Sequence, residues 1–295
     1  MTYRLSIVFL NFNRVAETRQ TTETLRHLCQ NHHDVEIIAV DNGSCDGTAE
    51  YLAAQHDIGY LSRPDNSGIA GYNTGFEHAR GEFVLVLDDD SCPADWASVE
   101  RALQHLEQRP ELGLLAFHIV SPDGSPQSSW HLPDRDTPAL TSGFIGCGFL
   151  IRRSLLNQIG GYPGDFFLYQ NEAYVAFKIR QAGFLMWYAP DCRVIHRGQP
   201  SSRPGWRRVF FPTRNTLWLI REFYPRPLAW YLLISRLLIG LVRAVQFGQL
   251  KCYVQAAWAG LSQPRPFTPM DADLRREFSP FLRQNSLWHQ LTRNL

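Results

Sequence analysis

An apolar run that ends in a cluster of carboxylates constrains the fold of this chain more than any other feature. Residues 83–87 are all apolar, and the next three are Asp88, Asp89 and Asp90. Such a run suits a central strand covered on both faces of a parallel sheet. Ligands of open α/β sheets bind beyond the carboxyl ends of the strands, so we expect a ligand site here. The alternative is a solvated acidic turn, because adjacent carboxylates repel one another unless water or a cation screens them.

Two further strands are predicted upstream. Residues 5–10 and 35–40 are apolar runs, and the second ends in Asp41 within a stretch rich in turn residues. Helical patterns separate the runs, and this alternation favours a parallel sheet with right-handed crossovers. Residues 66–75 are rich in Gly and Asn and open another helix, where free backbone N–H groups favour phosphate. An ordinary glycine-rich helix start is an equal alternative.

Composition excludes several other classes of protein. The 295 residues include 44% hydrophobic residues, which is ample for a core, and six cysteines without a CxxC pair. The sequence therefore indicates neither a zinc ribbon nor a disulfide framework. We expect a reducing, cytoplasmic location, since the N-terminal residues show no signal-peptide pattern.

The order of these motifs resembles the family 2 glycosyltransferases, including inverting enzymes of the bacterial rhamnosyltransferase type. The resemblance is carried by residues 7–14, 40–48, 66–75 and 87–90. It implies an α/β GT-A nucleotide-sugar-binding fold, with a mostly parallel central sheet flanked by helices. It also implies a set of donor-binding residues: Leu10, Asn11, Phe12, Asp41, Asn66, Gly68, Asn73, Asp88, Asp89 and Asp90.

The resemblance also implies a divalent metal, Mn²⁺ or Mg²⁺. Asp88 and Asp90 form the Asp-x-Asp motif of the family, and His196 stands where members often place a metal-ligating histidine. Carboxylate oxygens and imidazole suit these ions, which would bring a diphosphate to the carboxylates. Arg203, Arg207 and Arg208 follow the histidine and are expected to bind the diphosphate.

The acceptor side departs from the family pattern. Members commonly show a Glu-Asp pair before an amphipathic helix, whereas this chain has Asn171 and Glu172. We expect Glu172 to be the catalytic base that takes the proton of the acceptor hydroxyl. Its alternative role is that of a carboxylate favouring the helix N-terminus. Trp130, Gly146, Cys147 and Asn171 are the other residues expected on the acceptor side.

The C-terminal half is strongly basic. From residue 193 to 251 there are eleven Lys or Arg residues and one acidic residue, Glu222. Interleaved aromatic residues suit contact with an anionic membrane, while a solvated basic face over core aromatics is the alternative. Residues 228–245 form an apolar helical stretch interrupted by Arg236 and Arg243, which favours an interfacial or bundle helix over a membrane span.

We therefore predict a GT-A catalytic domain over residues 1–210 and a helical region, membrane- or partner-associated, over residues 211–295. The expected activity is inverting, metal-dependent transfer of a sugar from a nucleotide diphosphate, UDP- or dTDP-linked, to a hydroxyl of a glycan or lipid-linked glycan. We expect a location at the inner face of the cell membrane and no nucleic-acid partner, and a homodimer stays open. The alternatives are a nucleotidyltransferase and a catalytically weakened binding protein with this fold.

Overall fold

The computed structural model describes residues 3–127, 136–198 and 205–292. Contacts divide the chain into two compact units. The first comprises Met1–Asp165 and Lys178–Gln199, and the second comprises Phe166–Phe177 and Pro200–Leu295. The compact units do not coincide with the predicted domains, residues 1–210 and 211–295. The domain boundary at residue 210 stays a prediction. A short internal segment, Phe166–Phe177, packs with the C-terminal helices.

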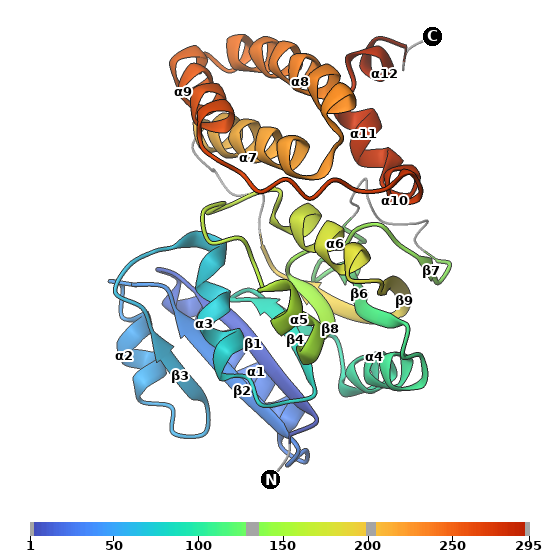
Figure 1. The fold of residues 1–295 in the computed structure, drawn as a ribbon. Helices are drawn as coiled ribbons and strands as arrows, with labels where there is room; N and C mark the ends of the chain where they lie inside the picture. The colour runs from blue at the N-terminus through green and yellow to red at the C-terminus, as the bar shows by residue number, and fades with distance from the viewer. Residues whose placement is uncertain (1–2, 128–135, 199–204, 293–295) are drawn as a thin grey trace. The chain divides into compact units, whose positions relative to one another are not determined.

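The first unit is built on one mixed sheet (Figure 1). Its strand order is β3-β2-β1-β4-β8-β6-β9-β5, and β7 also pairs with β9. β1, β2, β3 and β4 run parallel, whereas β8 is antiparallel to both of its neighbours. The strands are β1 (Leu5–Asn11), β2 (Val35–Asp41), β3 (Gly59–Ser62), β4 (Phe83–Asp88), β5 (Ser91–Pro93), β6 (Leu112–Val120), β7 (Ala139–Leu140), β8 (Gly148–Arg152) and β9 (Leu185–His196).

The apolar runs form the central strands because helices cover both of their faces. Every residue of β4 before Asp88 is buried, and β1 is buried over most of its length. The core cluster joins side chains from these strands, such as Phe9 and Leu85, to α1 and α4. Burying large aliphatic and aromatic side chains of this kind contributes roughly 1.5–3 kcal/mol each. The predicted central position of residues 83–87 is confirmed.

The helices of the first unit fill the crossovers between strands. They are α1 (Val15–Cys29), α2 (Thr48–Ala53), the 3₁₀ turn η1 (Gly68–Ala70), α3 (Gly71–His78), α4 (Trp96–Gln108) and α5 (Arg153–Ile159). Asp95 caps the N-terminus of α4, because its Oδ1 accepts a hydrogen bond from Ser98 N at 2.6 Å. α3 lies close on β1 and β2, because a Cβ at Gly75 would meet Val8 Cγ1 at 2.5 Å.

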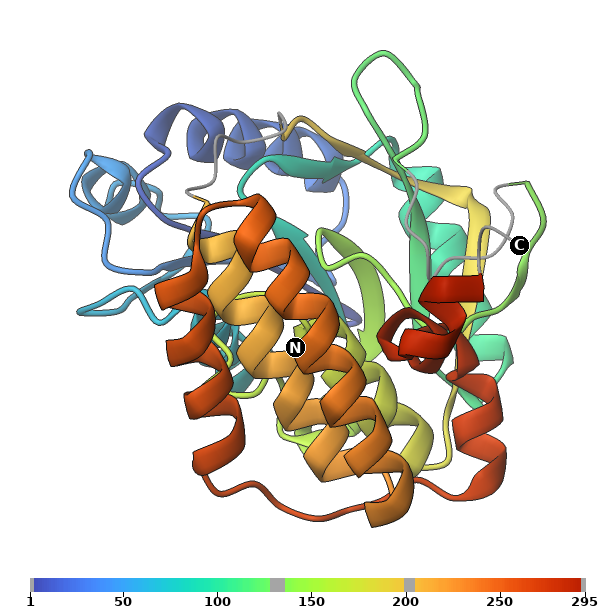
Figure 2. The ribbon, with the colours of Figure 1, turned by 90° about the horizontal axis from the view of Figure 1, so that it is seen from above.

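The second unit is helical. α7, α8 and α9 pack against one another (Figure 2). Aromatic rings join the internal segment to these helices, since Phe177 packs edge-on against Phe223, Phe278 and Phe281 at 4.5–5.3 Å between centroids. The helices are α6 (Asn171–Gln181), which begins in this unit, α7 (Arg207–Phe223), α8 (Arg226–Gln246), α9 (Leu250–Ser262), α10 (Ala272–Glu277), α11 (Ser279–Asn285) and α12 (Leu287–Thr292).

Candidate active site

Polar residues from three parallel strands meet at one edge of the sheet. In the parallel registers Asn11 pairs with Asp41, and Leu10 pairs with Asp88. The carboxyl ends of β1, β2 and β4 therefore lie side by side, as the sequence predicts. This edge carries the candidate site.

Two of the three carboxylates at the end of β4 are buried, and Asp88 is half-buried. Asp89 and Asp90 are 5% and 3% exposed. The turn is held from both sides, because Thr21 Oγ1 donates to the carbonyl oxygen of Asp89 at 2.6 Å and Ser91 Oγ donates to that of Cys147 at 2.8 Å. The solvated acidic turn, an alternative that the sequence left open, does not describe this region. Buried carboxylates are unfavourable unless a cation pairs with them or a proton neutralises them.

Arg14 is one of these partners. Its Nη1 lies 2.7 Å from Asp89 Oδ1 and 2.7 Å from Asp90 Oδ2. Burial raises the pKa of Asp89 well above its usual range, and the neighbouring carboxylates add to this effect against the charge of Arg14. Arg14 thus neutralises part of the triplet, on the side of the Asp90 carboxylate that His196 does not occupy.

His196 is the second partner of Asp90. β5 and β9 pair with Ser91 opposite His196, and this register brings His196 Nε2 to 3.2 Å from Asp90 Oδ1. Burial opposes the charged form of Asp90, but hydrogen bonds and charge from His196 and Arg14 hold its pKa at about 2. Burial likewise lowers the pKa of His196, yet the Asp90 contact raises it above the ordinary value.

Gln127 orients the imidazole from the opposite side. Its Oε1 lies 2.8 Å from His196 Nδ1, and its Nε2 donates to the backbone carbonyl of His196 at 3.1 Å. Because an amide oxygen only accepts, Nδ1 carries a proton. Nε2 faces Asp90 Oδ1: it donates to that carboxylate when the ring is charged, and in the neutral ring its lone pair is available to a cation shared with Asp90. Gly198 keeps this edge open, since a Cβ there would lie 2.5 Å from Nε2. The ring is thus oriented as a metal ligand.

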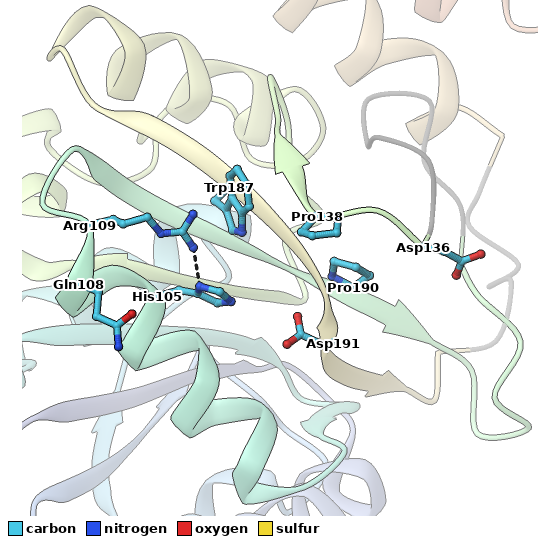
Figure 3. A pocket seen from close by; sticks show the side chains of 8 residues that line it. All are labelled: His105, Gln108, Arg109, Asp136, Pro138, Trp187, Pro190 and Asp191. Atoms are coloured by element: carbon cyan, nitrogen blue, oxygen red, sulfur yellow. Dashed lines mark hydrogen bonds between the residues drawn. The ribbon is translucent and has the colours of Figure 1, made fainter.

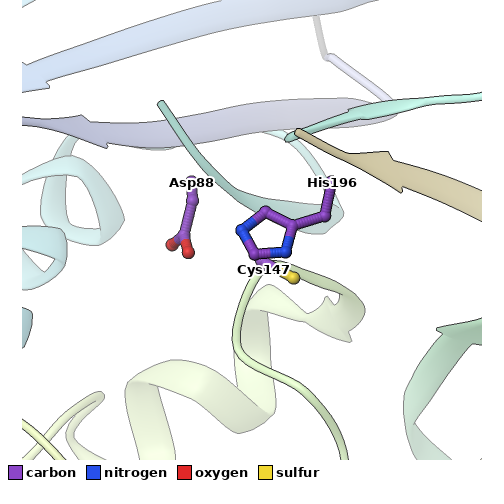
Figure 4. A group of neighbouring side chains, drawn as sticks. All are labelled: Asp88, Cys147 and His196. Carbon is purple, nitrogen blue, oxygen red and sulfur yellow. The ribbon is translucent and has the colours of Figure 1, made fainter. Parts of the chain in front are cut away.

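The side chains near His196 include several possible ligands for a divalent cation. Ligand atoms of Asp88, Cys147 and His196 all lie within 4.8 Å of one another (Figure 4), and Asp90 contacts His196 directly. Carboxylate oxygens with one imidazole nitrogen fit Mn²⁺ or Mg²⁺, whereas a thiolate would favour softer ions. The set Asp88, Asp90 and His196, predicted from sequence, therefore fits a hard divalent ion chemically.

Two residues that the sequence did not single out help to hold this edge of the sheet. Tyr72 OH lies 2.7 Å from Asp88 Oδ1 and 2.6 Å from the carbonyl oxygen of Leu87. Asn42 Nδ2 donates to Asn66 Oδ1 and to the carbonyl oxygen of Gly68, each at 3.0 Å. The segment that begins at Asn66 is thereby tied to the end of β2. The general preference of Asn for turns after strands was the one available signal for Asn42.

The predicted donor residues differ in their surroundings. Asn11 is buried and donates to the carbonyl oxygen of Val40, and Asp41 accepts from Ser44 N. Phe12 is 37% exposed, and Leu10 is half-buried. Asn73 uses both amide atoms on the backbone of Tyr162, each at 2.9 Å. The role of Asn73 toward a donor therefore stays a prediction, and its visible role is structural.

The predicted acceptor-side residues are distributed over both units. Cys147 is buried beside the acidic triplet and follows the half-buried Gly146. Asn171 and Glu172 begin α6 in the second unit, and Asn171 is 2% exposed. Among the diphosphate candidates, Arg207 and Arg208 begin α7. Trp130 and Arg203 lie outside the described residues.

The segment leading into Glu172 has an unusual backbone. Phe167, Tyr169 and Gln170 have φ values of 60°, 68° and 64°, which L side chains rarely adopt. Asn215 of α7 holds this loop, with Nδ2 at 3.0, 2.8 and 2.8 Å from the carbonyl oxygens of residues 166, 168 and 169. Arg214 adds a bond to the first of them at 2.9 Å.

A separate pocket of about 470 Å³ lies between α4 and β9 (Figure 3). His105, Asp191 and the adjacent Cys192 are close enough to share an ion. However, Arg109 is hydrogen-bonded to His105, and Arg101 Nε lies 3.4 Å from Asp191 Oδ2. Two guanidinium groups already serve these ligands, so the arrangement disfavours a further cation.

The mixed sheet, with acidic residues at the end of β4, defines a nucleotide-sugar-binding GT-A architecture. Two solved structures share it. The mannosyltransferase PcManGT from Pyrobaculum calidifontis, in complex with GDP-Man and Mn²⁺, has a TM-score of 0.57 at 16% identity over 98% of this chain and 84% of that one. GalNAc-T7, with UDP, GalNAc and Mn²⁺, has a TM-score of 0.60 at 14% identity over 92% and 59%.

Residues 6–176 match the family Glycosyl transferase family 2, and the chain belongs to this family. The N-acetylglucosaminyl-diphospho-decaprenol L-rhamnosyltransferase of Mycobacterium tuberculosis is 24% identical over 55% of this chain and 66% of its own length. The putative teichuronic acid biosynthesis glycosyltransferase TuaG of Bacillus subtilis is 30% identical over 52% and 64%. These matches span just under two thirds of each relative. The predicted family and fold class are confirmed.

Proposed function

We propose that this protein is an inverting, divalent-metal-dependent glycosyltransferase. It moves a sugar from a nucleotide diphosphate donor to a hydroxyl of a glycan or lipid-linked glycan. The observation that carries the proposal is the Asp90–His196 pair at the carboxyl end of the sheet. There Gln127 leaves Nε2 available as a ligand and Asp88 lies alongside. Family membership and the nucleotide sugars and Mn²⁺ in the solved structures of similar fold support it.

The donor would bind at the shared edge of β1, β2 and β4. In this proposal Asp41 and Asn11 contact the nucleoside, while Asp88, Asp90 and His196 hold Mn²⁺ or Mg²⁺. A bound ion supplies positive charge to the diphosphate as it leaves. Arg14 must shift from Asp90 or share the carboxylate with that ion, because it already occupies Oδ2. Arg207 and Arg208 remain candidates for further diphosphate contacts.

Glu172 is the proposed general base. It takes the proton of the acceptor hydroxyl as that oxygen bonds to the anomeric carbon. The bond from the anomeric carbon to the diphosphate oxygen breaks, and the nucleotide diphosphate leaves with the electron pair. Attack opposite the leaving group inverts the configuration. Asn215 supports this role as a positioning residue, since it fixes the backbone that enters α6.

The partners follow from the same proposal. UDP- and dTDP-linked sugars are the first donors to test, and GDP-linked sugars are the comparison. The relative from M. tuberculosis is named for a diphospho-decaprenol compound, which favours a lipid-linked acceptor for this chain as well. We accordingly place the enzyme at the cytoplasmic face of the membrane, as a monomer or homodimer.

Thermal stabilisation by candidate donors tests the proposal. A ligand that binds only the native state raises Tm by mass action. We expect one nucleotide sugar to raise Tm with Mn²⁺ present but not with EDTA. Asp90→Asn should abolish that difference, whereas Asp34→Asn, an exposed aspartate just before β2 at the other end of that strand, should not. A donor that stabilises the protein equally with EDTA would exclude the metal from binding.

A further inference from the structure

The second unit exposes two continuous apolar stripes. On α8 the exposed residues recur every three or four positions, and on α9 they do the same, so each set lies along one side of its helix. All are between 40% and 74% exposed. They are Trp230, Ile234, Leu238, Leu241, Val242 and Val245 on α8, and Leu250, Val254, Trp258 and Leu261 on α9.

The stripes are not the core faces of these helices. The buried residues of α8 include Leu232, Arg236, Gly240 and Ala244, on its other side. There α9 approaches closely, because a Cβ at Gly240 would lie 2.8 Å from Tyr253 Cε2. Both helices also pack against α7. The residues of the apolar stripes therefore do not contribute to the core of the second unit.

α8 is better suited to lie along a membrane than to cross one. Within the described residues it is the one helix long and apolar enough to span a bilayer, and 39% of that window is already buried inside the protein. A spanning α8 would have to give up this packing. Its buried guanidinium, Arg236, would then face lipid, which is costly.

The charge of α8 and α9 indicates whether an anionic bilayer or a second copy of this chain would cover the stripes. Residues 226–262 contain no Asp or Glu, and the cations Arg226, Arg243 and Lys251 are exposed. In a two-fold interface between copies the same surface meets itself, so these cations would face cations with no carboxylate between them. An anionic bilayer provides the missing charge, and exposed tryptophans such as Trp230 and Trp258 favour the lipid–water interface.

We propose that the stripes of α8 and α9 form a docking surface for an anionic lipid bilayer, with both helices lying in the plane of the membrane surface. This inference rests on the proposed function for its purpose, since a lipid-linked acceptor resides in the bilayer. Binding to the lipid surface itself requires neither donor nor catalysis.

Vesicle flotation with the full-length protein tests the proposal. We expect the protein to float with phosphatidylcholine–phosphatidylglycerol vesicles at low salt, and less with phosphatidylcholine alone or at high salt. Val242→Glu should reduce the floated fraction by about tenfold, because docking would then place a carboxylate in the apolar part of the bilayer interface. Leu140→Glu is the matched control, since Val242 and Leu140 are 58% and 57% exposed and Leu140 lies on β7 of the first unit.

Charge reversal separates the electrostatic part of binding. Arg243→Glu should weaken flotation at low salt, and Arg276→Glu, an exposed arginine of α10, should not. Absence of wild-type flotation with the anionic vesicles would overturn the proposal. So would a dimer in sedimentation that Val242→Glu dissociates without loss of flotation, because the stripe would then join two copies. Donor stabilisation measured without lipid reports separately on the proposed function.

Discussion

His196 Nε2 lies 3.2 Å from Asp90 Oδ1, and its Nδ1 lies 2.8 Å from Gln127 Oε1. The imidazole is thus held between a carboxylate and an amide whose oxygen fixes the position of the ring proton. An outer partner of this kind tunes a metal ligand without touching the metal.

Gln127→Ala should therefore weaken metal binding while leaving Asp88, Asp90 and His196 in place. Loss of such a partner typically costs about 10–100-fold in metal affinity. Calorimetric titration with Mn²⁺ measures the change. Ser125→Ala alters the same loop without touching His196 and is the control. Equal affinities in all three proteins would mean that Gln127 does not orient the ligand.

The Asp90–His196 pair should make stability depend on pH. The folded-state pKa of Asp90 is about 2, below its ordinary value of 3.8. Its contribution is present above about pH 4 and is lost as the pH falls toward 2. The pKa of His196 is raised, so its contribution is present below about pH 6.5 and is lost as the pH rises through the higher folded value.

Thermal melts in EDTA across this range check the effect. We expect the Tm difference between wild type and Asp90→Asn to be largest between about pH 4 and pH 6.5, and to shrink on both sides. Because Asp90 is buried and paired, the highest Tm of this variant over the pH range should also lie below that of wild type. Parallel profiles would show that the pair does not titrate with folding.

Glu172→Gln tests the proposed base. The amide keeps the shape of the side chain but cannot take a proton, so kcat should fall by roughly 10²–10⁴-fold with little change in donor binding. Steady-state kinetics with the donor found by thermal stabilisation provide the measurement. Glu111→Gln, an exposed glutamate of the first unit, should turn over normally. Wild-type turnover in Glu172→Gln would assign the base to another residue.

Asn215→Ala removes the amide that holds the loop before α6. The buried carbonyl groups of that loop lose their donor, and the left-handed residues lose the contacts that maintain their strain. We expect a loss of roughly 2–3 kcal/mol in unfolding free energy, together with a lower kcat. Asn285→Ala is the matched control: Asn285 is equally buried in the second unit but donates one bond, to the Phe281 carbonyl oxygen at 2.8 Å.

If both asparagine variants lost the same stability and neither changed kcat, the contacts of Asn215 would be purely structural. A fall in kcat confined to Asn215→Ala would instead support its positioning role.

Arg236→Met should stabilise the protein. The Arg236 side chain is buried in α8, and among the residues that the structure describes its Nε has no hydrogen-bond partner. Burial together with Arg243 lowers its pKa to about 10. Replacing buried charged groups by apolar side chains of similar volume is often neutral or stabilising by about 1–4 kcal/mol. Denaturant unfolding measures the gain, and Arg276→Met on α10 should be neutral. Destabilisation would reveal a counter-ion for Arg236.

Sequence predicted the parts of the site that depend on strand register. Asn11, Asp41 and Asp88 each follow an apolar run, and parallel pairing places such positions at one edge whatever the loops do. The family pattern added His196, whose approach to Asp90 depends on the pairing of β5 with β9.

The missing parts depend on side-chain contacts between distant segments. Gln127 lies in a loop without a motif, and Asn215 is an ordinary residue within a helix. Nothing in the pattern around Arg14 predicts that it bridges Asp89 and Asp90. Such pairings arise only when the packed elements bring the groups together, so periodicity and spacing do not encode them.

The inclusion of Phe166–Phe177 in the second unit has a consequence for recombination between relatives. A chimera joined at a single crossover between residues 177 and 200 would pair one parent's loop with the other parent's helices. Asn215 from one parent would then have to bind the backbone carbonyl groups of the other parent's loop. An exchange of acceptor preference between family members should therefore transplant the internal segment together with the C-terminal helices, and a crossover map of active hybrids would show the two inherited as a block.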